Sequence, residues 1–262
     1  MPTKATVVEQ AYSYLKEAEA NHESIRPLTE LIENFTIEDA YNTQLTIIDD
    51  KVSSGAKIVG KKIGLTSYAM QNLLGVDQPD YGHLLDNMES KDKGEVSISS
   101  LFQPKVEGEI AFVLKEDLIG PNVTVDQVLN ATAYVVPALE IVDSRIQDWN
   151  IKLADTVADN ASCGLFVIGP NKISPTIDLP SIQMQLLRNG KVVNKGMGSD
   201  VLGSPANCVA WLANTLFDYG VTLKKGEVIL SGALTAAVAI EPGDTFTAKF
   251  TELGEVSVCF VK

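Results

Sequence analysis

Hydrophobic residues in the first fifty positions recur with the period of an amphipathic helix. In the first of two such segments the apolar positions are Val7, Ala11, Leu15 and Ala18. The second segment opens at Thr36, which is suited to cap a helix, and Asp39 stands where it can complete a capping box. Its apolar positions are Ala40, Tyr41, Leu45, Ile48 and Val52. The pattern therefore predicts two helices, each of which buries one stripe of side chains.

From Ile58 onward the apolar residues fall in short β-rich runs that alternate with turn residues. Residues 75–88 contain glycine and proline at several positions, and we expect a structured loop there. Residues 183–188 read as a strand, and the Asn-Gly pair at Asn189 indicates a hairpin after it. The last forty residues read as further strands separated by Gly/Pro turns.

Two helices interrupt this β-rich part. One opens at Thr124, and the other has Ser204 as its cap, Pro205 at its first position and Gly220 as its stop. Helices at the front and strands behind them are typical of an α+β fold. We expect a helical N-terminal region over residues 1–57 and a mainly-β domain over residues 58–262. No long linker separates the two parts, so they should pack together.

The charge balance narrows the possible partners. The formal net charge is -13, so nucleic acid and anionic membrane surfaces are not expected to bind. No apolar run approaches ~18 residues, so no transmembrane helix is expected, and the N-terminal residues lack the apolar core of a signal peptide. Cys163, Cys208 and Cys259 lie far apart in apolar segments, which indicates buried free thiols. We expect a cytoplasmic protein.

Acidic residues inside apolar strands are the strongest chemical signal in the chain. In the predicted strand KVEGEIAFVL, Glu107 and Glu109 share one face, roughly 7 Å apart along the backbone. Glu140 lies in another apolar strand. They could be surface charges on edge strands, but apolar residues flank all three. Buried carboxylates need protons or a cation, and three of them suit Mg²⁺ or Mn²⁺. Both interpretations stay open on residue chemistry alone.

Other motifs carry less weight. Residues 55–62 nearly match a phosphate-binding loop, but Lys62 stands where the Mg²⁺-binding hydroxyl should be. His22 and His83 are too few for a histidine-rich zinc site, and no G-x-S-x-G accompanies them, so we interpret both as surface or core-lining residues. Lys62 and Asp80 are each more often solvated charges, but beside a metal site they are candidates for general acid–base catalysis.

Four segments together carry a family resemblance. They are GKKIGLTSYAMQNLLGVDQPDYGHLLDNM, LFQPKVEGEIAFVL, VVPALEIVDSRIQDWNIKLADTVADNASCG and GEVILSGALTAAVAIEPGDTFTAKF. They resemble the 2-keto-4-pentenoate hydratase branch of the fumarylacetoacetate hydrolase superfamily, in the same order and from about Gly60 to the C-terminus. The resemblance implies a mixed β-sandwich roll of the fumarylacetoacetate hydrolase C-terminal type, packed against the helical N-terminal region.

The resemblance also implies roles for individual residues. By its E-x-E and P-A-L-E motifs, Glu107, Glu109 and Glu140 would be the ligands of Mg²⁺ or Mn²⁺. The family's catalytic lysine falls on Lys62, with Lys61 as the alternative register, and its acidic partner falls on Asp80. The resemblance places four residues near the substrate: Lys61, Leu65, Asp159 and Ser162.

The implied activity is hydration of 2-hydroxypenta-2,4-dienoate (2-oxopent-4-enoate) to 4-hydroxy-2-oxopentanoate in the meta-cleavage catabolism of aromatic compounds. The alternative is decarboxylation of 4-oxalocrotonate (2-oxo-3-hexenedioate), since SGALTAAVAI partly resembles that branch while SRIQDW and NASCG resemble the hydratases. Hydrolysis of an acylpyruvate would need His83 to activate water. A silent structural subunit is a further possibility. The resemblance implies a homo-oligomer, which could also associate with the sister enzyme.

Overall fold

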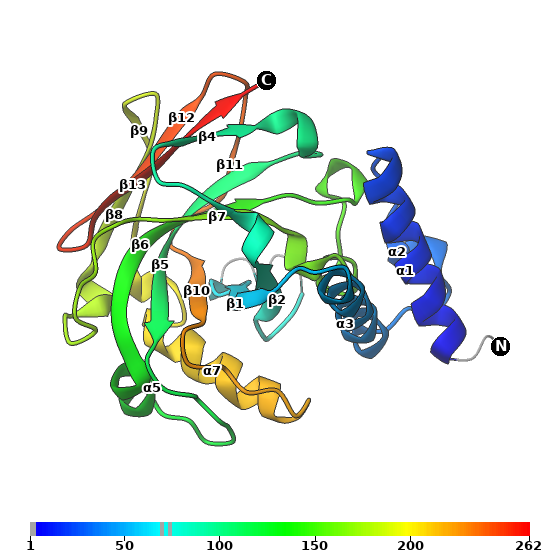
Figure 1. The fold of residues 1–262 in the computed structure, drawn as a ribbon, viewed down its shortest axis with the longest axis horizontal. Coiled ribbons are helices and arrows are strands. Elements are labelled where there is room, and N and C mark those ends of the chain that lie inside the picture. The colour runs from blue at the N-terminus through cyan, green and yellow to red at the C-terminus, as the bar shows by residue number, and fades with distance from the viewer. Residues whose placement is uncertain (1–3, 69–70, 73–74) are drawn as a thin grey trace.

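The computed structural model describes residues 4–68, 71–72 and 75–262 of the chain. Its helices lie mainly at one end and along one side of two β-sheets, as Figure 1 shows. The helices are α1 (Lys4–Asn21), α2 (Leu28–Leu31), α3 (Ile37–Ser53), α5 (Val125–Ala131), α6 (Leu153–Ala158) and α7 (Pro205–Phe217). No helix in these ranges is long and apolar enough to cross a bilayer. The predicted α+β class is confirmed.

The larger sheet is mixed and carries the strands that matter for the site. Over the described residues its strand order is β2-β1-β10-β5-β6-β7-β3, with β11 paired to β5. Its members are β1 (Ile58–Gly64), β2 (Asp80–Leu85), β3 (Glu89–Ser90), β5 (Lys105–Leu114), β6 (Thr132–Val142), β7 (Cys163–Ile168), β10 (Val228–Ala233) and β11 (Val238–Ala239). The β1–β10 and β3–β7 pairs are parallel, and the others are antiparallel. In Figure 1, β5 and β6 are long, strongly bent strands.

The smaller sheet packs against one face of the larger one. Its order is β4-β13-β12-β8-β9, and its strands are β4 (Gly94–Ser97), β8 (Gln183–Arg188), β9 (Lys191–Met197), β12 (Thr245–Phe250) and β13 (Gly254–Val261). Between the sheets, Gly108 of β5 leaves room for Met184, because a side chain at Gly108 would lie 2.8 Å from its terminal carbon. The hairpin predicted at Asn189 joins β8 to β9 and is confirmed.

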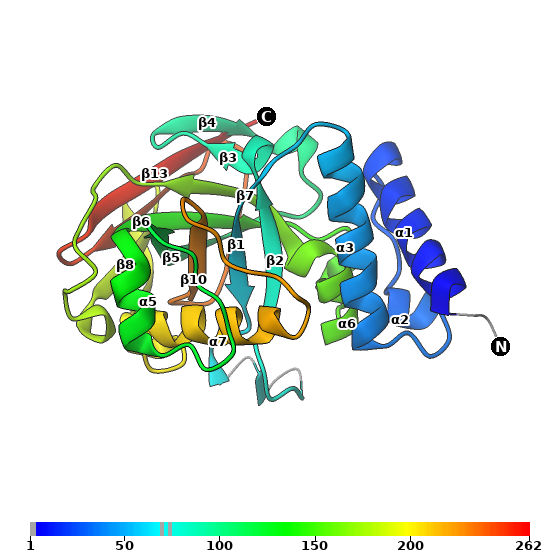
Figure 2. The ribbon, with the colours of Figure 1, turned by 60° about the horizontal axis from the view of Figure 1, so that its bottom comes forward.

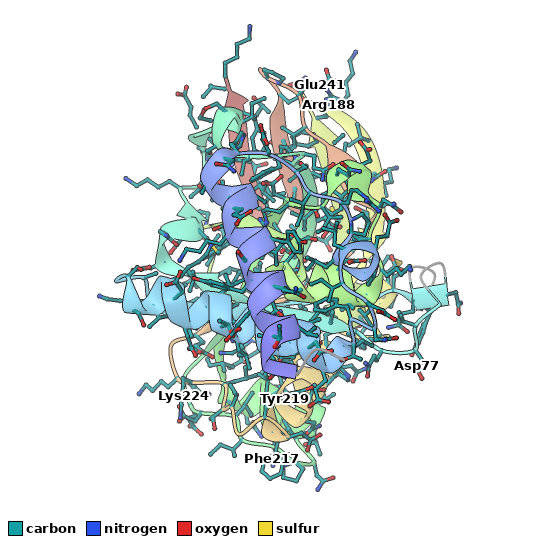
Figure 3. All side chains as sticks on the ribbon, turned by 90° about the vertical axis from the view of Figure 1, so that its right-hand side faces the viewer. Asp77, Arg188, Phe217, Tyr219, Lys224 and Glu241 are labelled. Atoms are coloured by element: carbon teal, nitrogen blue, oxygen red, sulfur yellow. The ribbon has the colours of Figure 1, made fainter. Side chains whose placement is uncertain are left out.

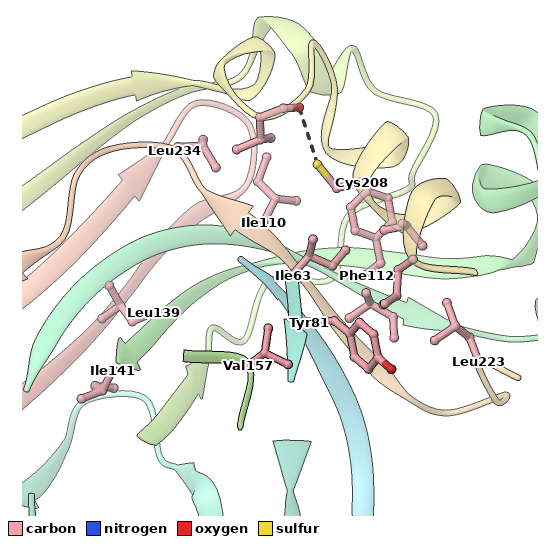
Figure 4. Close-up of a cluster of buried hydrophobic side chains, with 14 of the residues drawn as sticks. Ile63, Tyr81, Ile110, Phe112, Leu139, Ile141, Val157, Cys208, Leu223 and Leu234 are labelled. Carbon is pink, nitrogen blue, oxygen red and sulfur yellow. Dashed lines mark hydrogen bonds between the residues drawn. The ribbon is translucent and has the colours of Figure 1, made fainter. Parts of the chain in front are cut away.

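One face of the larger sheet contributes to the main core. Ile110 and Phe112 of β5 lie among side chains from α7 and from β1, as Figure 4 shows. In the same cluster the Cys208 thiol lies 3.7 Å from the carbonyl oxygen of Val201. Cys163 is also buried, whereas Cys259 is half-buried. A smaller apolar cluster lies on the other face: Leu84, Ala111, Val136, Ala138, Cys163, Phe166 and Leu230. The candidate site shares that second face.

The N-terminal helices follow the predicted pattern closely. Figure 2 shows α1 and α3 side by side, and the four expected apolar residues of α1 are buried. The Thr36 hydroxyl accepts a hydrogen bond from the Asp39 amide at 3.1 Å, and the Asp39 carboxylate accepts from the Thr36 amide at 3.1 Å. The predicted burial of Val52 is wrong. This side chain is 40% exposed because it lies in the last turn of α3, next to the exposed turn at 54–55.

The expectation of a loop over residues 75–88 is also wrong for its second half. Residues Asp80–Leu85 form β2, which is completely buried and antiparallel to β1. Glycine here serves close packing inside a strand: a side chain at Gly82 would lie 2.4 Å from the carbonyl oxygen of Asn160. The helix starts expected at Thr124 and Ser204 are confirmed, although the Ser204 side chain makes no capping hydrogen bond.

Some large apolar side chains are exposed at the surface. Figure 3, which looks onto α1, shows Phe217 and Tyr219 at one end of the molecule and Arg188 and Glu241 at the other. Phe217 and Tyr219 are 43% and 44% exposed. Arg188 binds Glu241 at 3.1 Å and Asp244 at 2.7 Å.

A buried amide ties α3 to the larger sheet. Gln44 donates to the carbonyl oxygens of Tyr81 and Val157, at 3.0 and 2.8 Å, and its Oε1 lies 3.0 Å from His83 Nδ1. His83 is therefore a core residue, which is one of the two positions, surface or core, that the sequence predicts for it. Burial, and then the charge of Lys61, lower the pKa of His83 to about 3.

We expect this histidine to make the protein less stable in mild acid. Below about pH 6.5 His83 becomes protonated in the unfolded chain but stays neutral in the folded chain. The free energy of unfolding therefore decreases as the pH falls from 6.5 toward 3. Between pH 6.5 and 5.5 the loss from this group is about 1 kcal/mol, because the unfolded imidazole is already half-protonated at pH 6.5. Urea unfolding of wild type and His83→Gln at both pH values measures it, with the exposed His22→Gln as control. An equal loss in wild type and His83→Gln would refute this account.

Candidate metal and substrate site

The site is built on two neighbouring strands. In the antiparallel register of β5 and β6, Glu107 lies directly opposite Glu140, and Glu109 is the next residue on the same face of β5. One carboxylate oxygen from each of the three lies within 4.8 Å of the other two. Glu109 and Glu140 are completely buried, and Glu107 is half-buried at the solvent side. The structure thus brings together the three acids that the sequence analysis selected.

Most buried oxygens without a hydrogen-bond partner gather at this site. Among the described residues they are Asp80 Oδ1, Glu109 Oε1, Glu140 Oε1 and Glu140 Oε2, together with Asp39 Oδ1 elsewhere. The second oxygen of Glu109 is satisfied, because it accepts from the Gly232 amide at 2.8 Å. Unpaired buried oxygens are costly, and a cation coordinated by them would remove that cost. The donor set, all hard oxygens, fits Mg²⁺ or Mn²⁺.

Electrostatics point to the same conclusion. Burial, and then the negative charge of Glu140, raise the pKa of Glu107 to about 7, although Lys62 and Lys105 act in the opposite direction. Burial, and then Glu140 and Glu107, raise the pKa of Glu109 well above its usual range. Burial also raises the pKa of Glu140. Three carboxylates that resist ionisation together need an added positive charge to be ionised at neutral pH.

Lys62 supplies one positive charge. It lies on β1 with its Nζ 3.4 Å from Glu140 Oε1, and it donates to the carbonyl oxygen of Ala161 at 3.0 Å. Burial lowers the pKa of Lys62, but the attraction of Glu140, Asp80 and Glu107 outweighs it and raises the pKa above the ordinary value. Lys62 is therefore a charged ammonium group beside the triad.

Lys61 points to the opposite face of β1, because side chains alternate along a strand. Its Nζ forms a buried ion pair with Glu227 Oε1 at 2.9 Å. The structure therefore places Lys62, and not Lys61, beside the three acids.

Asp80 shares the space next to Lys62. It is the first residue of β2, pairs with Gly64 and is buried. A side chain at Gly64 would overlap Asp80 Oδ1 at 2.1 Å and approach Lys62 Nζ at 3.1 Å, so glycine keeps this space open for the two polar groups. Burial raises the pKa of Asp80 to about 6, against the lowering effect of Lys62. Two titratable groups thus lie together at the edge of the triad.

A strained turn presents the carbonyl group that holds Lys62. Asn160, Ala161 and Ser162 all have positive φ, at 53°, 50° and 53°, which is unfavourable for residues other than glycine and is typical of functional sites. The Asn160 side chain fixes the turn to β2: its Oδ1 accepts from the His83 amide at 2.8 Å, and its Nδ2 donates to the His83 carbonyl oxygen at 2.9 Å. Asn160 is not among the predicted site residues, although a polar residue within a small-residue stretch is a usable signal.

The other two residues predicted on this turn have protein partners. Ser162 Oγ lies 3.1 Å from Thr156 Oγ1, and both are buried. Asp159 binds Arg145, which donates to it from both its backbone amide and its side chain. The Asp159 carboxylate thus fixes the turn to Arg145. Arg145 is a second residue that the sequence analysis did not single out.

Leu65 lies where β1 ends, with φ of 56°. Its carbonyl oxygen accepts from Gln71 Nε2 at 2.7 Å. The next residue, Thr66, fills the space above Gly232, where a side chain would lie 2.2 Å from its hydroxyl. The Gly232 amide donates to Glu109, so the segment after β1 packs directly on the residue that positions this acid.

Comparison with known proteins identifies the family of the chain. Residues 90–261 match the fumarylacetoacetate (FAA) hydrolase C-terminal family. The chain is 49% identical to a 2-hydroxyhexa-2,4-dienoate hydratase of Comamonas testosteroni, over 95% of each chain. It is 47% identical to a 2-keto-4-pentenoate hydratase of Paraburkholderia xenovorans (strain LB400), over 96% of this chain and 94% of the other.

Among solved structures, a 4-oxalocrotonate decarboxylase from Pseudomonas putida G7, complexed with magnesium and adipate, superposes with a TM-score of 0.95. It is 38% identical, and the match covers 100% of this chain and 99% of the other. The predicted fold type, with the helical region included, is thereby confirmed. The chain belongs to the fumarylacetoacetate hydrolase superfamily and, within it, to the 2-keto-4-pentenoate hydratase family.

Proposed function

We propose that the protein is a metal-dependent hydratase that adds water to 2-hydroxypenta-2,4-dienoate (2-oxopent-4-enoate) and releases 4-hydroxy-2-oxopentanoate. Nearly full-length identity of 47–49% to hydratases of such dienoates supports the reaction class. The observation that carries the proposal is the cluster of buried carboxylate oxygens without a hydrogen-bond partner on Glu109 and Glu140, beside Glu107. Buried carboxylate oxygens without partners are costly, and a bound divalent cation would satisfy them.

Glu107, Glu109 and Glu140 would hold Mg²⁺ or Mn²⁺. When bound, such an ion supplies Lewis acidity toward the carboxylate and 2-oxo oxygens of the substrate and so favours its enolate form. The three acids come from the rigid centre of the sheet, and Gly232 fixes one of them, so the donor set is preorganised.

Lys62 and Asp80 would carry the proton transfers. Hydration moves the proton of the 2-hydroxyl group to the terminal carbon, C5. Water then adds across the C3–C4 bond, with its hydroxyl on C4 and a proton on C3. Lys62 is held by the Ala161 carbonyl oxygen and beside Glu140, with Asp80 in the same enclosed space. The ammonium of Lys62 also offsets negative charge on the substrate. Leu65 and Ser162 would line the substrate, whereas Asp159 would act by holding the turn that carries Ser162.

Decarboxylation of 4-oxalocrotonate is the second candidate. The superposition over the whole chain with a decarboxylase of that substrate favours it, because the same enolate-stabilising chemistry can follow loss of carbon dioxide. The higher identity to the hydratases ranks it second. Acylpyruvate hydrolysis is disfavoured because His83 does not face the three acids. Its ring contacts Gln44, and it pairs with Lys61, whose side chain points away from the triad.

A product assay with purified protein separates these candidates. With Mg²⁺, we expect loss of 2-hydroxypenta-2,4-dienoate absorbance with formation of 4-hydroxy-2-oxopentanoate, and EDTA should abolish it until Mg²⁺ is restored. Supplying 2-oxo-3-hexenedioate should release carbon dioxide at least tenfold more slowly. Faster release of carbon dioxide than hydration would favour the decarboxylase, and activity that survives EDTA would refute the metal-dependent reaction.

The expected assembly stays a prediction. Exposed apolar residues on the edge strand β9 and at the C-terminal end of α7 offer surface for subunit contacts: Val192, Val193, Met197, Phe217 and Tyr219. We predict a homo-oligomer by light scattering of the purified protein. Protein with no turnover on either substrate that binds a sister enzyme tightly would instead indicate a structural subunit.

A further inference from the structure

Lys105 stands at the solvent side of the acidic triad. It is the first residue of β5 and precedes Glu107 by two positions, so both side chains lie on one face of the strand. Glu109, the next residue on that face, is completely buried, while Glu107 and Lys105 are half-buried. Exposure therefore increases along this face from Glu109 to Glu107 and Lys105, which makes the Lys105 end the open side of the site.

An aromatic ring holds the Lys105 ammonium in place. Its Nζ lies 4.2 Å from the centroid of the Trp149 ring, the geometry of a cation–π contact. The ring is itself fixed, because Trp149 Nε1 donates to the carbonyl oxygen of Gln103 at 3.0 Å. Asp148 and Trp149 both have positive φ, at 57° and 54°, so an unfavourable backbone turn positions this ring.

The charge of the site explains what such a cation can do. Four carboxylates meet there, those of Glu107, Glu109, Glu140 and Asp80. Lys62 and a divalent ion together leave one negative charge uncompensated, in a chain whose net charge is -13. The proposed substrate is itself a carboxylate, so a positive group at the open side would favour its approach and binding.

We propose that Lys105 is a substrate-binding residue whose ammonium, held over Trp149, meets the carboxylate-bearing substrate at the open side of the triad. The inference rests on the anionic 2-oxo acid of the proposed function. The same positive charge should affect metal binding in the opposite direction. Because Lys105 lies beside Glu107, its positive charge repels a divalent cation, so it should weaken metal binding while it strengthens binding of the organic anion.

The test measures both affinities by calorimetry. The probes are Mg²⁺ alone and, with Mg²⁺ in excess, 2-oxopentanoate, which has the 2-oxo acid group but no double bond to hydrate. Lys105→Met should bind 2-oxopentanoate about tenfold more weakly and Mg²⁺ severalfold more tightly. Lys105→Arg, which keeps the charge and stacks on aromatic rings, should stay close to wild type. Added salt should weaken 2-oxopentanoate binding more in wild type than in Lys105→Met.

Lys172→Met is the matched control. Lys172 Nζ lies 4.7 Å from the Tyr134 ring centroid, so its removal also deletes a cation–π contact but away from the triad, and neither affinity should change. Unchanged binding of 2-oxopentanoate to Lys105→Met would overturn the proposal. Weaker binding of both probes would also overturn it, because damage to the fold weakens both. Wild type that binds 2-oxopentanoate through Lys105 but hydrates no dienoate would overturn only the hydratase function.

Discussion

Replacing Glu109 by glutamine is expected to lower kcat/KM for the dienoate about a thousandfold, equivalent to about 4 kcal/mol of transition-state stabilisation. The amide is nearly isosteric, and its oxygen can still accept from the Gly232 amide. What is lost is the charge that would hold the divalent ion. Steady-state kinetics at saturating Mg²⁺ measures the effect. The control is Glu116→Gln, which changes an exposed acid just beyond the same strand and should leave the kinetics unaltered.

The same variant should be more stable than wild type when no metal is present. Glu109 is completely buried and has an unpaired oxygen. Without metal, the folded chain must either protonate Glu109 or keep its charge beside Glu107 and Glu140, and glutamine has neither cost. We therefore expect a higher Tm in EDTA and a smaller rise in Tm on adding Mg²⁺. A variant that keeps wild-type activity and the full Mg²⁺-induced rise would show that Glu109 is not a ligand.

Lys62→Met and Lys61→Met are expected to fail in different ways. Lys62→Met should lower kcat about a thousandfold through loss of a proton-transfer group, because its ammonium lies in the site beside Glu140 and the Ala161 carbonyl oxygen. Lys61→Met should leave kcat within about threefold but lower the free energy of unfolding by about 3–5 kcal/mol, since it leaves Glu227 buried without its partner.

Kinetics and urea unfolding of the two variants, both with Mg²⁺ present, check this contrast. The two residues are neighbours of the same type, and both are buried, so differences in composition or burial do not confound the comparison. A larger loss of kcat in Lys61→Met than in Lys62→Met would mean that the register of β1 has been assigned wrongly and would remove the assignment of Lys62 as the proton carrier.

Sequence reasoning worked best where local pattern and chemistry agreed. The stripe of α1, the capping box of α3 and the buried strand β5 each follow from spacing that only one element satisfies. The acids Glu107, Glu109 and Glu140 could be selected because charges inside apolar strands are rare. Their meeting could not be derived from the chain alone, because it depends on the register between β5 and β6, which is a long-range pairing.

The errors and omissions also have physical causes. The sequence predicts a loop at β2 because glycine and proline precede the strand, whereas its burial depends on contacts with the distant turn that contains Asn160. Asn160 supports the site through hydrogen bonds to the backbone of β2, and Arg145 does so through an ion pair with Asp159; neither contact leaves a hydrophobic period in the sequence. Val52 matched the helical period, but the helix extends beyond the packed surface.

Anomalous diffraction at the manganese edge, from crystals of the protein grown with Mn²⁺, tests the central claim most directly. We predict one strong peak per chain, bounded by an oxygen of each of Glu107, Glu109 and Glu140 at about 2–2.5 Å. In crystals of Glu109→Gln at the same Mn²⁺ concentration the peak should be lost or much weaker. A peak elsewhere, or three carboxylates without a bound ion at saturating Mn²⁺, would contradict the metal site.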